Sequence, residues 1–247
     1  MSRDNSPEID RELQTVRLFL TEPHDCSYIA EERATTAFVD PEIQVSIALY
    51  QQLAEQGFRR SGRFHYRPHC SNCQACISVR IPVAAFTPNR SQKRCAQRNH
   101  NIVIEAKQQI DRAEHYALFE HYIARRHSDG DMYPASPSQF DNFLGSRSES
   151  TLYLEMRLNG QLVGCAVSDR LGNSLSAIYT YFDPQQSKRS LGTLAILAQL
   201  DLARQWRLEF VYLGYWIANS NKMAYKTQFK PLEYFCGQGW SPEPPTQ

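Results

Sequence analysis

The alternation of apolar and polar residues is clearest in the second half of the chain. Three segments alternate in this way and are separated by the turns Asn159-Gly160 and Gly172-Asn173; they are 151–158, 161–171 and 174–182. A period of two is typical of strands with one buried face, and short turns of this composition join antiparallel neighbours. The pattern therefore predicts an antiparallel meander of three strands.

Helical periodicity follows the meander. A predicted helix over 191–204 leads into an aromatic strand over 210–217, and its apolar face contains Leu194, Leu197, Ala198 and Leu202. A helix that connects two neighbouring strands of one sheet makes those strands parallel. We therefore expect an α+β fold with a mixed, mostly antiparallel sheet.

The first half of the chain predicts shorter elements. Asp40-Pro41-Glu42 supplies an N-cap, a proline at the first helical position and an early acid, so a helix should run from there to Gly57. Residues 237–247 are rich in proline and poor in apolar residues, so we expect a disordered tail. The other predicted elements are a strand ending near residue 21, a hairpin over 58–67 that turns at Ser61-Gly62, strands at 78–83 and 101–107, and helices at 89–100, 111–127 and 140–144.

The composition favours a globular protein that is not exported. The chain has 247 residues, of which 42% are hydrophobic, so it can bury a sizeable core. Its first ten residues carry charge and proline where a signal peptide would be apolar, and no run of 18 apolar residues follows. Seven cysteines are an odd number, and reduced thiols are favoured in a chain of this length. We expect a cytoplasmic protein without a membrane partner.

Charge is distributed unevenly along the chain. The net charge is only +1, yet no Asp or Glu occurs in the 47 residues from 58 to 104. A local excess of positive charge favours phosphate binding, although a solvated basic face is the alternative. Four cations of the predicted helix at 89–100 have helical spacing and could form one positive stripe; they are Arg90, Lys93, Arg94 and Arg98.

The cysteines form a candidate metal site. Cys70, Cys73 and Cys76 follow a C-x-x-C-x-x-C pattern in a loop, and Cys26 on another loop could supply a fourth thiolate. Four thiolates suit Zn²⁺ or an iron–sulfur cluster, and spacers of two residues let neighbouring thiolates converge on one ion. Reduced cysteines without a metal are the alternative, and the pattern leaves both open.

A second group of cations precedes the helix at 191–204. The turn at 186–192 contains Lys188 and Arg189, and the following helix N-terminus could help to hold an anion. An ordinary turn between a strand and a helix explains the segment equally well.

Aromatic residues and lysines are interleaved over 212–231. The segment includes Trp216, Lys222 and Lys226. Such rings can stack on an unpaired adenosine while the ammonium groups bind phosphate or carboxylate. A buried strand end followed by solvated lysines is the alternative.

Six longer motifs are together more specific than any of these spacings. They are CSYI at 26–29, RRSGRFHYRPHCSNCQAC at 59–76, SVRIPV at 78–83, RSQKR at 90–94, SLGTLAIL at 190–197 and YLGYWIANSNKMAYKTQFKP at 212–231. In this order they resemble the bacterial aspartate/glutamate leucyltransferases, which are relatives of the eukaryotic arginyl-tRNA–protein transferases. The resemblance runs from about residue 10 to residue 235.

The resemblance implies an activity and a domain organisation. It implies transfer of leucine from leucyl-tRNA to the N-terminal Asp or Glu of a protein, which marks that protein for the N-degron pathway. It also implies a Cys-containing, basic N-terminal module, here residues 1–100, and a GNAT-like acyltransferase domain, here residues 101–236. The eukaryotic relatives pair C-G-Y-C with a vicinal Cys-Cys, whereas this chain has CSYI at 26–29. Their iron–sulfur or haem role therefore does not carry over.

The implied reaction sets chemical requirements. An aminoacyl ester is already activated, so positioning is the main task and no cofactor is required. The attacking α-amine has to be neutral, and the developing oxyanion needs hydrogen-bond donors. We predict that hydroxyl groups of Tyr215, Ser220 or Tyr225 assist this step.

Binding roles follow from charge and shape. Selection of an acidic N-terminus needs a fixed cation beside the acceptor side chain, and the candidates are Arg80, Lys222 and Lys226. Trp216 belongs to the rings that could stack on the terminal adenosine. The tRNA backbone should rest on a larger set of cations, namely Arg90, Lys93, Arg94, Arg98, Lys188 and Arg189.

Two other functions remain open. A GNAT-type N-acetyltransferase that uses acetyl-CoA would need only the second half of the chain, but its pyrophosphate-binding turn should contain more glycine than 186–192. A non-catalytic, zinc-binding RNA module would account for the cysteines and arginines but not for the long second half. An assay of aminoacyl transfer separates these functions.

Overall fold

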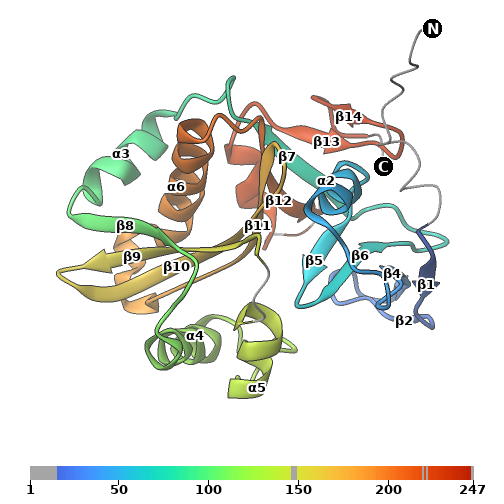
Figure 1. Ribbon diagram of the computed structural model, residues 1–247, viewed down its shortest axis with the longest axis horizontal. Helices are drawn as coiled ribbons and strands as arrows, with labels where there is room; N and C mark the ends of the chain where they lie inside the picture. The colour runs from blue at the N-terminus through green and yellow to red at the C-terminus, as the bar shows by residue number, and fades with distance from the viewer. Residues whose placement is uncertain (1–15, 146–148, 219, 221, 246–247) are drawn as a thin grey trace, which may run out of the picture.

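The computed structural model describes residues 16–145, 149–218, 220 and 222–245 (Figure 1). Its central feature is an eight-stranded sheet. From one edge to the other, the strands are β14 (Trp240–Ser241), β13 (Glu233–Phe235), β7 (Ile77–Pro82), β12 (Phe210–Trp216), β11 (Ser174–Phe182), β10 (Gln161–Arg170), β9 (Thr151–Leu158) and β8 (Ile102–Lys107).

The meander and the crossover both lie in this sheet. β9, β10 and β11 are consecutive antiparallel neighbours, and helix α6 (Leu191–Gln205) connects β11 to the parallel strand β12. In the described part of the sheet, every other pair is antiparallel. The predicted α+β fold with a mixed, mostly antiparallel sheet is confirmed.

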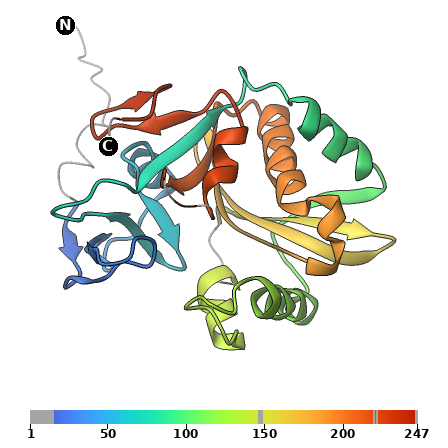
Figure 2. The same ribbon diagram turned by 180° about the vertical axis from the view of Figure 1, so that it is seen from behind.

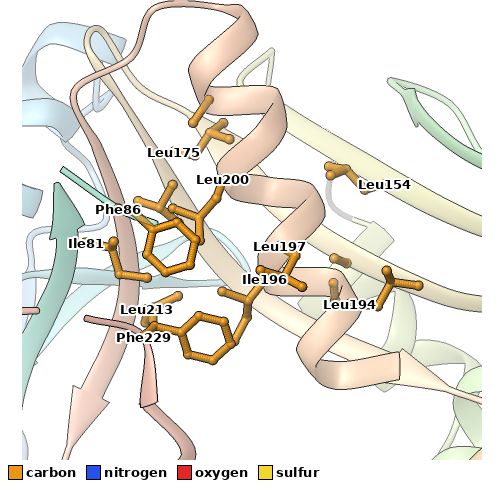
Figure 3. Packing of buried hydrophobic residues seen from close by; sticks show 14 of the residues in the cluster. Ile81, Phe86, Leu154, Leu175, Leu194, Ile196, Leu197, Leu200, Leu213 and Phe229 are labelled. Carbon is orange, nitrogen blue, oxygen red and sulfur yellow. The ribbon is translucent and has the colours of Figure 1, made fainter. Parts of the chain in front are cut away.

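Helices cover both faces of the sheet (Figure 1, Figure 2). α6 packs on one face, and Figure 3 shows its Leu197 in the same core as Ile81 of β7 and Leu213 of β12. Helix α4 (Arg112–Arg126) packs on the other face through Phe119 and Ile123. Burial of one such side chain contributes about 1.5–3 kcal/mol. The two cores therefore hold β10 and β11 between them.

The N-terminal part of the chain forms a smaller sheet. Its four strands are β1 (Leu18–Leu20), β4 (Thr36–Val39), β6 (Phe64–Pro68) and β5 (Arg59–Ser61), in this order. Strands β2 (His24–Asp25) and β3 (Arg33–Ala34) form a separate pair. The predicted hairpin is confirmed, because β5 and β6 pair on either side of the turn at 62–63.

The predicted start of the first helix was wrong. Helix α2 spans Ile47–Glu55 and begins after Ser46, whose hydroxyl accepts a hydrogen bond from the amide of Leu49 at 3.1 Å. Asp40 accepts instead from the amide of Glu42 at 3.0 Å and pairs with Arg17. Its carboxylate closes a local turn, so the helical signals at residues 40–42 mark a loop.

The boundary expected near residue 100 does not separate two sheets. β7 lies between β13 and β12 in the large sheet, and helix α3 (Arg90–Arg98) packs against α6. The short helix expected at 140–144 consists of α5 (Pro137–Phe140) and a π-helical turn, η2 (Asp141–Gly145). No described helix has the length and apolar character needed to cross a bilayer.

The C-terminal segment differs from the expected disordered tail. β14 pairs with β13, and the indole nitrogen of Trp240 donates to the carbonyl oxygen of Glu55 at 2.9 Å. The Trp240 ring also packs against Tyr212, with ring centroids 5.4 Å apart. The Trp240 ring therefore anchors a C-terminal segment that has few other apolar residues.

A buried ion pair joins the two sheets. Arg60 of β5 donates to both carboxylate oxygens of Asp169 on β10, at 2.5 and 2.8 Å. The side chains are 5% and 0% exposed. Tyr50 and Thr151 also donate hydroxyl hydrogen bonds to Asp169, each at 2.9 Å. The carboxylate is therefore fully used in holding β5 against the large sheet.

We expect Asp169→Asn to destabilise the protein by about 3–5 kcal/mol, because it leaves the buried Arg60 guanidinium without its counter-charge. Urea unfolding measures this change. Asp141→Asn is the control, since the exposed pair of Asp141 with Arg112 contributes about 1 kcal/mol or less. Equal losses in the two variants would contradict the assigned role of Asp169.

Candidate active site

The parallel strands β11 and β12 separate at one end. They pair from Ser174 and Phe210 to Ser176 and Tyr212 and no further, although β11 continues to Phe182. On its other side β12 has a bulge between Tyr212 and Gly214. Gly214 adopts a φ of +84°, which favours glycine. The strands therefore part in the middle of the sheet, leaving backbone groups available to side chains.

Arg59 of β5 enters this separation. Its guanidinium donates to the hydroxyl of Ser176 at 2.9 Å and to the carbonyl oxygen of Ala177. Arg59 is only 5% exposed. Among the described residues, no carboxylate lies within salt-bridge distance of it. A buried guanidinium without a counter-charge is costly, so this position is suited to an anion.

Lys226 approaches the same point from another element. It lies on a 3₁₀ helix, η4 (Ala224–Gln228), and its ammonium group donates to the carbonyl oxygen of Tyr215. A Cβ atom on Gly214 would lie 3.6 Å from Lys226 Nζ and 3.5 Å from Arg59 Nε. Burial, together with the charge of Arg59, lowers the pKa of Lys226 to about 7. Two buried nitrogen groups thus converge on a glycine backbone.

One tyrosine lies beside Lys226, and two further tyrosines pack together on β11 and α4. Tyr225 is 46% exposed, and its ring centroid lies 5.8 Å from Lys226 Nζ. The hydroxyl oxygen of Tyr179, on β11, is buried and has no hydrogen-bond partner among the described residues. Tyr122 of α4 packs against Tyr179 at 6.3 Å between ring centroids. An unpartnered buried hydroxyl is costly in the free protein and is available to a substrate.

The other predicted hydroxyls are placed differently. The Tyr215 hydroxyl can donate to the carbonyl oxygen of Gly57 at 3.0 Å or of Tyr66 at 3.2 Å, and burial raises its pKa. Tyr215 therefore presents its backbone carbonyl, not its hydroxyl, to Lys226. Ser220 lies between residues outside the described part, and its amide donates to the carbonyl oxygen of Ile217 at 3.1 Å.

Two of the predicted binding residues lie at the margin of the site. Lys222 is exposed and pairs with Asp129 at 2.9 Å. Trp216 is half-buried, and its ring packs against Tyr234 with centroids 5.3 Å apart. Lys222 therefore tethers the loop after α4, while Trp216 belongs to the end of β12.

Arg80 already has a carboxylate partner. Its Nε donates to Glu233 at 2.7 Å, and its guanidinium lies 3.6 Å from the ring centroid of Phe210 and 4.3 Å from that of Trp240. The group is thus enclosed by rings and neutralised within the sheet. In this arrangement Arg80 joins β7, β12, β13 and β14 and already has a carboxylate partner.

The predicted tRNA-binding cations lie on two elements that contact each other. Arg98 donates to the carbonyl oxygen of Lys188, and Arg189 donates to the side chain of Asn101 at 3.2 Å. These contacts join α3 to the 3₁₀ helix η3 (Pro184–Arg189). We name the combined surface the basic ridge, and it consists of Arg90, Lys93, Arg94, Arg98, Lys188 and Arg189.

The basic ridge adjoins the cationic site. Gln92, in the first turn of α3, donates through its side-chain amide to the carbonyl oxygen of Gln228 at 3.1 Å. Gln228 ends the same 3₁₀ helix that carries Lys226. A polyanion on the ridge would therefore lie against the element that bears the buried lysine.

Comparisons with known proteins identify the family. The family model for the N terminus of "Arginine-tRNA-protein transferase" matches residues 24–94 of this chain, and the model for its C terminus matches residues 114–236. An "Aspartate/glutamate leucyltransferase" of Saccharophagus degradans is 50% identical over 230 residues, which are 93% of this chain and 98% of the relative. The chain belongs to the aspartate/glutamate leucyltransferase family. The predicted resemblance is confirmed.

Other members of the leucyltransferase family agree. The protein of that name from Pseudomonas fluorescens is 48% identical over 93% of this chain and 97% of its own length. Among solved structures, that of FemX covers 88% of this chain and 85% of its own, with a TM-score of 0.48 and 10% identity. Membership of the leucyltransferase family alone makes this chain an aminoacyltransferase.

The four cysteines of the predicted metal site lie near one another, but they do not form a metal-binding geometry. Burial and the neighbouring thiols raise the pKa of Cys76 to about 12, and those thiols belong to Cys26, Cys70 and Cys73. Within the described residues, however, no three His, Cys, Asp or Glu side chains are arranged to hold a metal ion. The predicted metal site stays a prediction.

Arg59 is the residue that sequence reasoning missed. Arg59 lies in the segment without Asp or Glu, and the sequence suggested no role for it. Arg59 and Arg60 are adjacent in a short strand and both buried. Two consecutive arginines in a strand of a predicted hairpin are an unusual signal, since at least one of them has to face the protein interior.

Proposed function

We propose that this protein transfers leucine from leucyl-tRNA to the N-terminal Asp or Glu of acceptor proteins, and so marks them for N-degron degradation. The relatives at about 50% identity carry this activity in their names. The structural observation that carries the proposal is the buried Arg59 without a described carboxylate partner, beside Lys226. Leucyl-tRNA and acidic N-termini are the proposed partners, and we place the reaction in the cytoplasm.

Arg59 is the proposed cation that selects the acceptor. The free protein buries its guanidinium without a described counter-charge, so an acceptor carboxylate would supply the charge that is missing. A neutral acceptor side chain would leave that desolvated charge unpaired. This supports a preference for Asp and Glu, and it replaces Arg80, which has Glu233 as its partner. We propose that Lys226 lies beside the same substrate.

The chemistry requires positioning more than covalent catalysis. Leucine arrives as an ester, and the protein has to hold its carbonyl group beside the acceptor amine. We propose that the Tyr225 hydroxyl, with Ser220, lies near the developing oxyanion, and that Trp216 and Lys222 bind the end of the tRNA. No cofactor is needed for this step. A metal at Cys26, Cys70, Cys73 and Cys76 would have a structural role. Metal analysis of the purified protein tests whether a metal is bound.

The proposed reaction should be visible in a direct transfer assay. We expect label to move from leucyl-tRNA to peptides that begin with Asp or Glu, and not to peptides that begin with Asn, Lys or Ala. Arginyl-tRNA and acetyl-CoA, each labelled separately, are the competing donors. Label from acetyl-CoA alone would favour the acetyltransferase, and tRNA binding without any transfer would favour the RNA-binding module.

Arg59→Gln should weaken the preference for acidic acceptors. Loss of a charged hydrogen-bond partner costs about 1.5–3 kcal/mol, so the ratio of kcat/KM for Asp over Asn peptides should fall at least about ten-fold. Arg80→Gln is the matched control, because it removes a largely enclosed guanidinium that already has a carboxylate. A change of preference in Arg80→Gln but not in Arg59→Gln would reverse the two assignments.

The basic ridge is the proposed binding surface for the tRNA backbone. Each phosphate contact contributes about 0.7–0.9 to the slope of log affinity against log salt. The double variant Arg90→Gln/Arg94→Gln should therefore lower this slope by about 1.5, as measured by fluorescence anisotropy with leucyl-tRNA. Arg125→Gln/Arg126→Gln, at the exposed end of α4, is the control. Equal slopes in all three proteins would exclude the ridge.

A further inference from the structure

The transfer reaction needs a group that removes a proton from the acceptor amine. An N-terminal amine has a pKa of about 7.7–8.0 and is mostly protonated at neutral pH. Arg59 cannot accept a proton, and the hydroxyl groups of Tyr66 and Tyr215 have pKa values raised by burial. Among the described residues, no carboxylate lies within salt-bridge distance of Arg59 or Lys226. Among the described groups of the site, Lys226 is therefore the one that can titrate near neutrality.

We propose that Lys226 is the catalytic base: its neutral amine removes the proton from the acceptor α-ammonium group and returns it to the ribose oxygen that leaves. This inference rests on the proposed function and assigns a step within it. It gives Lys226 a role different from that of Arg59, although both lie at Gly214.

The geometry prepares the amine for this role. Lys226 is 6% exposed, and its Nζ donates to the carbonyl oxygen of Tyr215 at the end of β12. A neutral amine that donates one N–H to a carbonyl keeps its lone pair free on another side. The strand end thus fixes the nitrogen at the separation of β11 and β12, where Arg59 also lies.

The surrounding groups favour the neutral form of the amine. Arg59 faces it from β5 and carries a permanent charge, Tyr215 faces it from β12, and Tyr225 precedes it on η4. Tyr66 of β6 packs behind Tyr215, at 6.1 Å between ring centroids. Only Arg59 among these carries charge at neutral pH, and its repulsion adds to desolvation in lowering the pKa of Lys226 to about 7.

Acceptor binding should strengthen the base. When an acceptor carboxylate pairs with Arg59, its negative charge offsets the repulsion that acts on Lys226, and the pKa of Lys226 rises. The amine then takes a proton more readily when the acceptor is acidic. Acceptor selection and proton removal are therefore coupled electrostatically, because Arg59 and Lys226 lie close together. This coupling needs no movement of the chain.

The proposed step conserves protons. The α-ammonium group gives one proton to Lys226, and its nitrogen then forms a bond to the ester carbonyl carbon. The bond from that carbon to the ribose oxygen breaks, and this oxygen takes the proton held by Lys226. The attacking nitrogen loses a second proton to water as the amide forms, and it keeps the third.

Lys226→Arg is the direct test, because the arginine side chain reaches the same position but cannot lose a proton. We expect kcat for leucine transfer to fall by about 10²–10⁴-fold, while affinity for leucyl-tRNA stays unchanged. In the unmodified protein kcat should rise with pH to a plateau, with a midpoint above the value of about 7 of the free protein because the bound acceptor carboxylate raises the Lys226 pKa, and the variant should lack this limb. Lys230→Arg, an exposed lysine nearby, is the control. A kcat within about three-fold of the unmodified value, with the same pH limb, would overturn the proposal.

Small amines give a second test, which also applies if the larger arginine side chain prevents folding. Activity lost in Lys226→Ala should return on addition of methylamine or ethylamine, in proportion to their basicity, whereas guanidinium should have no effect. Absence of rescue would count against the base. A protein that never transfers leucine, even unmodified, would refute the proposed function itself, so the two failures are distinguishable.

Discussion

The buried ion pair of Arg60 and Asp169 is the constraint on which the arrangement of the site depends. It joins a hairpin of the small sheet to the middle of the large sheet, across 109 positions of sequence. A pair this deeply buried gains little net stability over an apolar contact of the same shape. Its value lies in register, since only one placement of β5 satisfies both carboxylate oxygens. That placement also fixes the neighbouring residue, Arg59, against β11.

Two adjacent arginines thus carry opposite electrostatic roles. Both are almost completely buried, and both have lost the solvation of a full charge. Arg60 recovers this loss through Asp169, whereas Arg59 has only neutral partners among the described residues. Such an unpaired charge is tolerated where a ligand completes it. The same charge lowers the pKa of Lys226, so in our proposal one missing counter-charge serves both acceptor binding and proton removal.

The path from the basic ridge to the site is short in space and discontinuous in sequence. α3 begins beside η4 through the contact of Gln92 with Gln228, and Phe86 stacks on Phe229 at 6.3 Å between ring centroids. The elements that carry the ridge and the lysine are therefore in contact, and Figure 2 shows helix α3 beside α6. A polyanion with its reactive end at Gly214 would meet cations along this side.

Local sequence patterns were sufficient to predict most of the helices and strands and the family. The period of two over 151–182 predicted the meander, and the helix between two strands predicted the parallel pair, because hydrophobic spacing is a property of neighbouring residues. The stripe on α3 and the long motifs were equally local. The helix start at Asp40 failed because its carboxylate bonds to a loop.

Only the tertiary structure decided the site. Arg80 and Arg59 are both arginines in short strands, and the sequence offered no way to tell that Glu233 neutralises one and that the other has no such described partner. Trp240, in a proline-rich segment, packs because Tyr212 and Glu55 lie far away in sequence but close in space. Charge, burial and pKa depend on such distant partners. The sequence by itself therefore determined which charged and aromatic side chains are available. Folding determined which of the described charges have a partner of opposite charge.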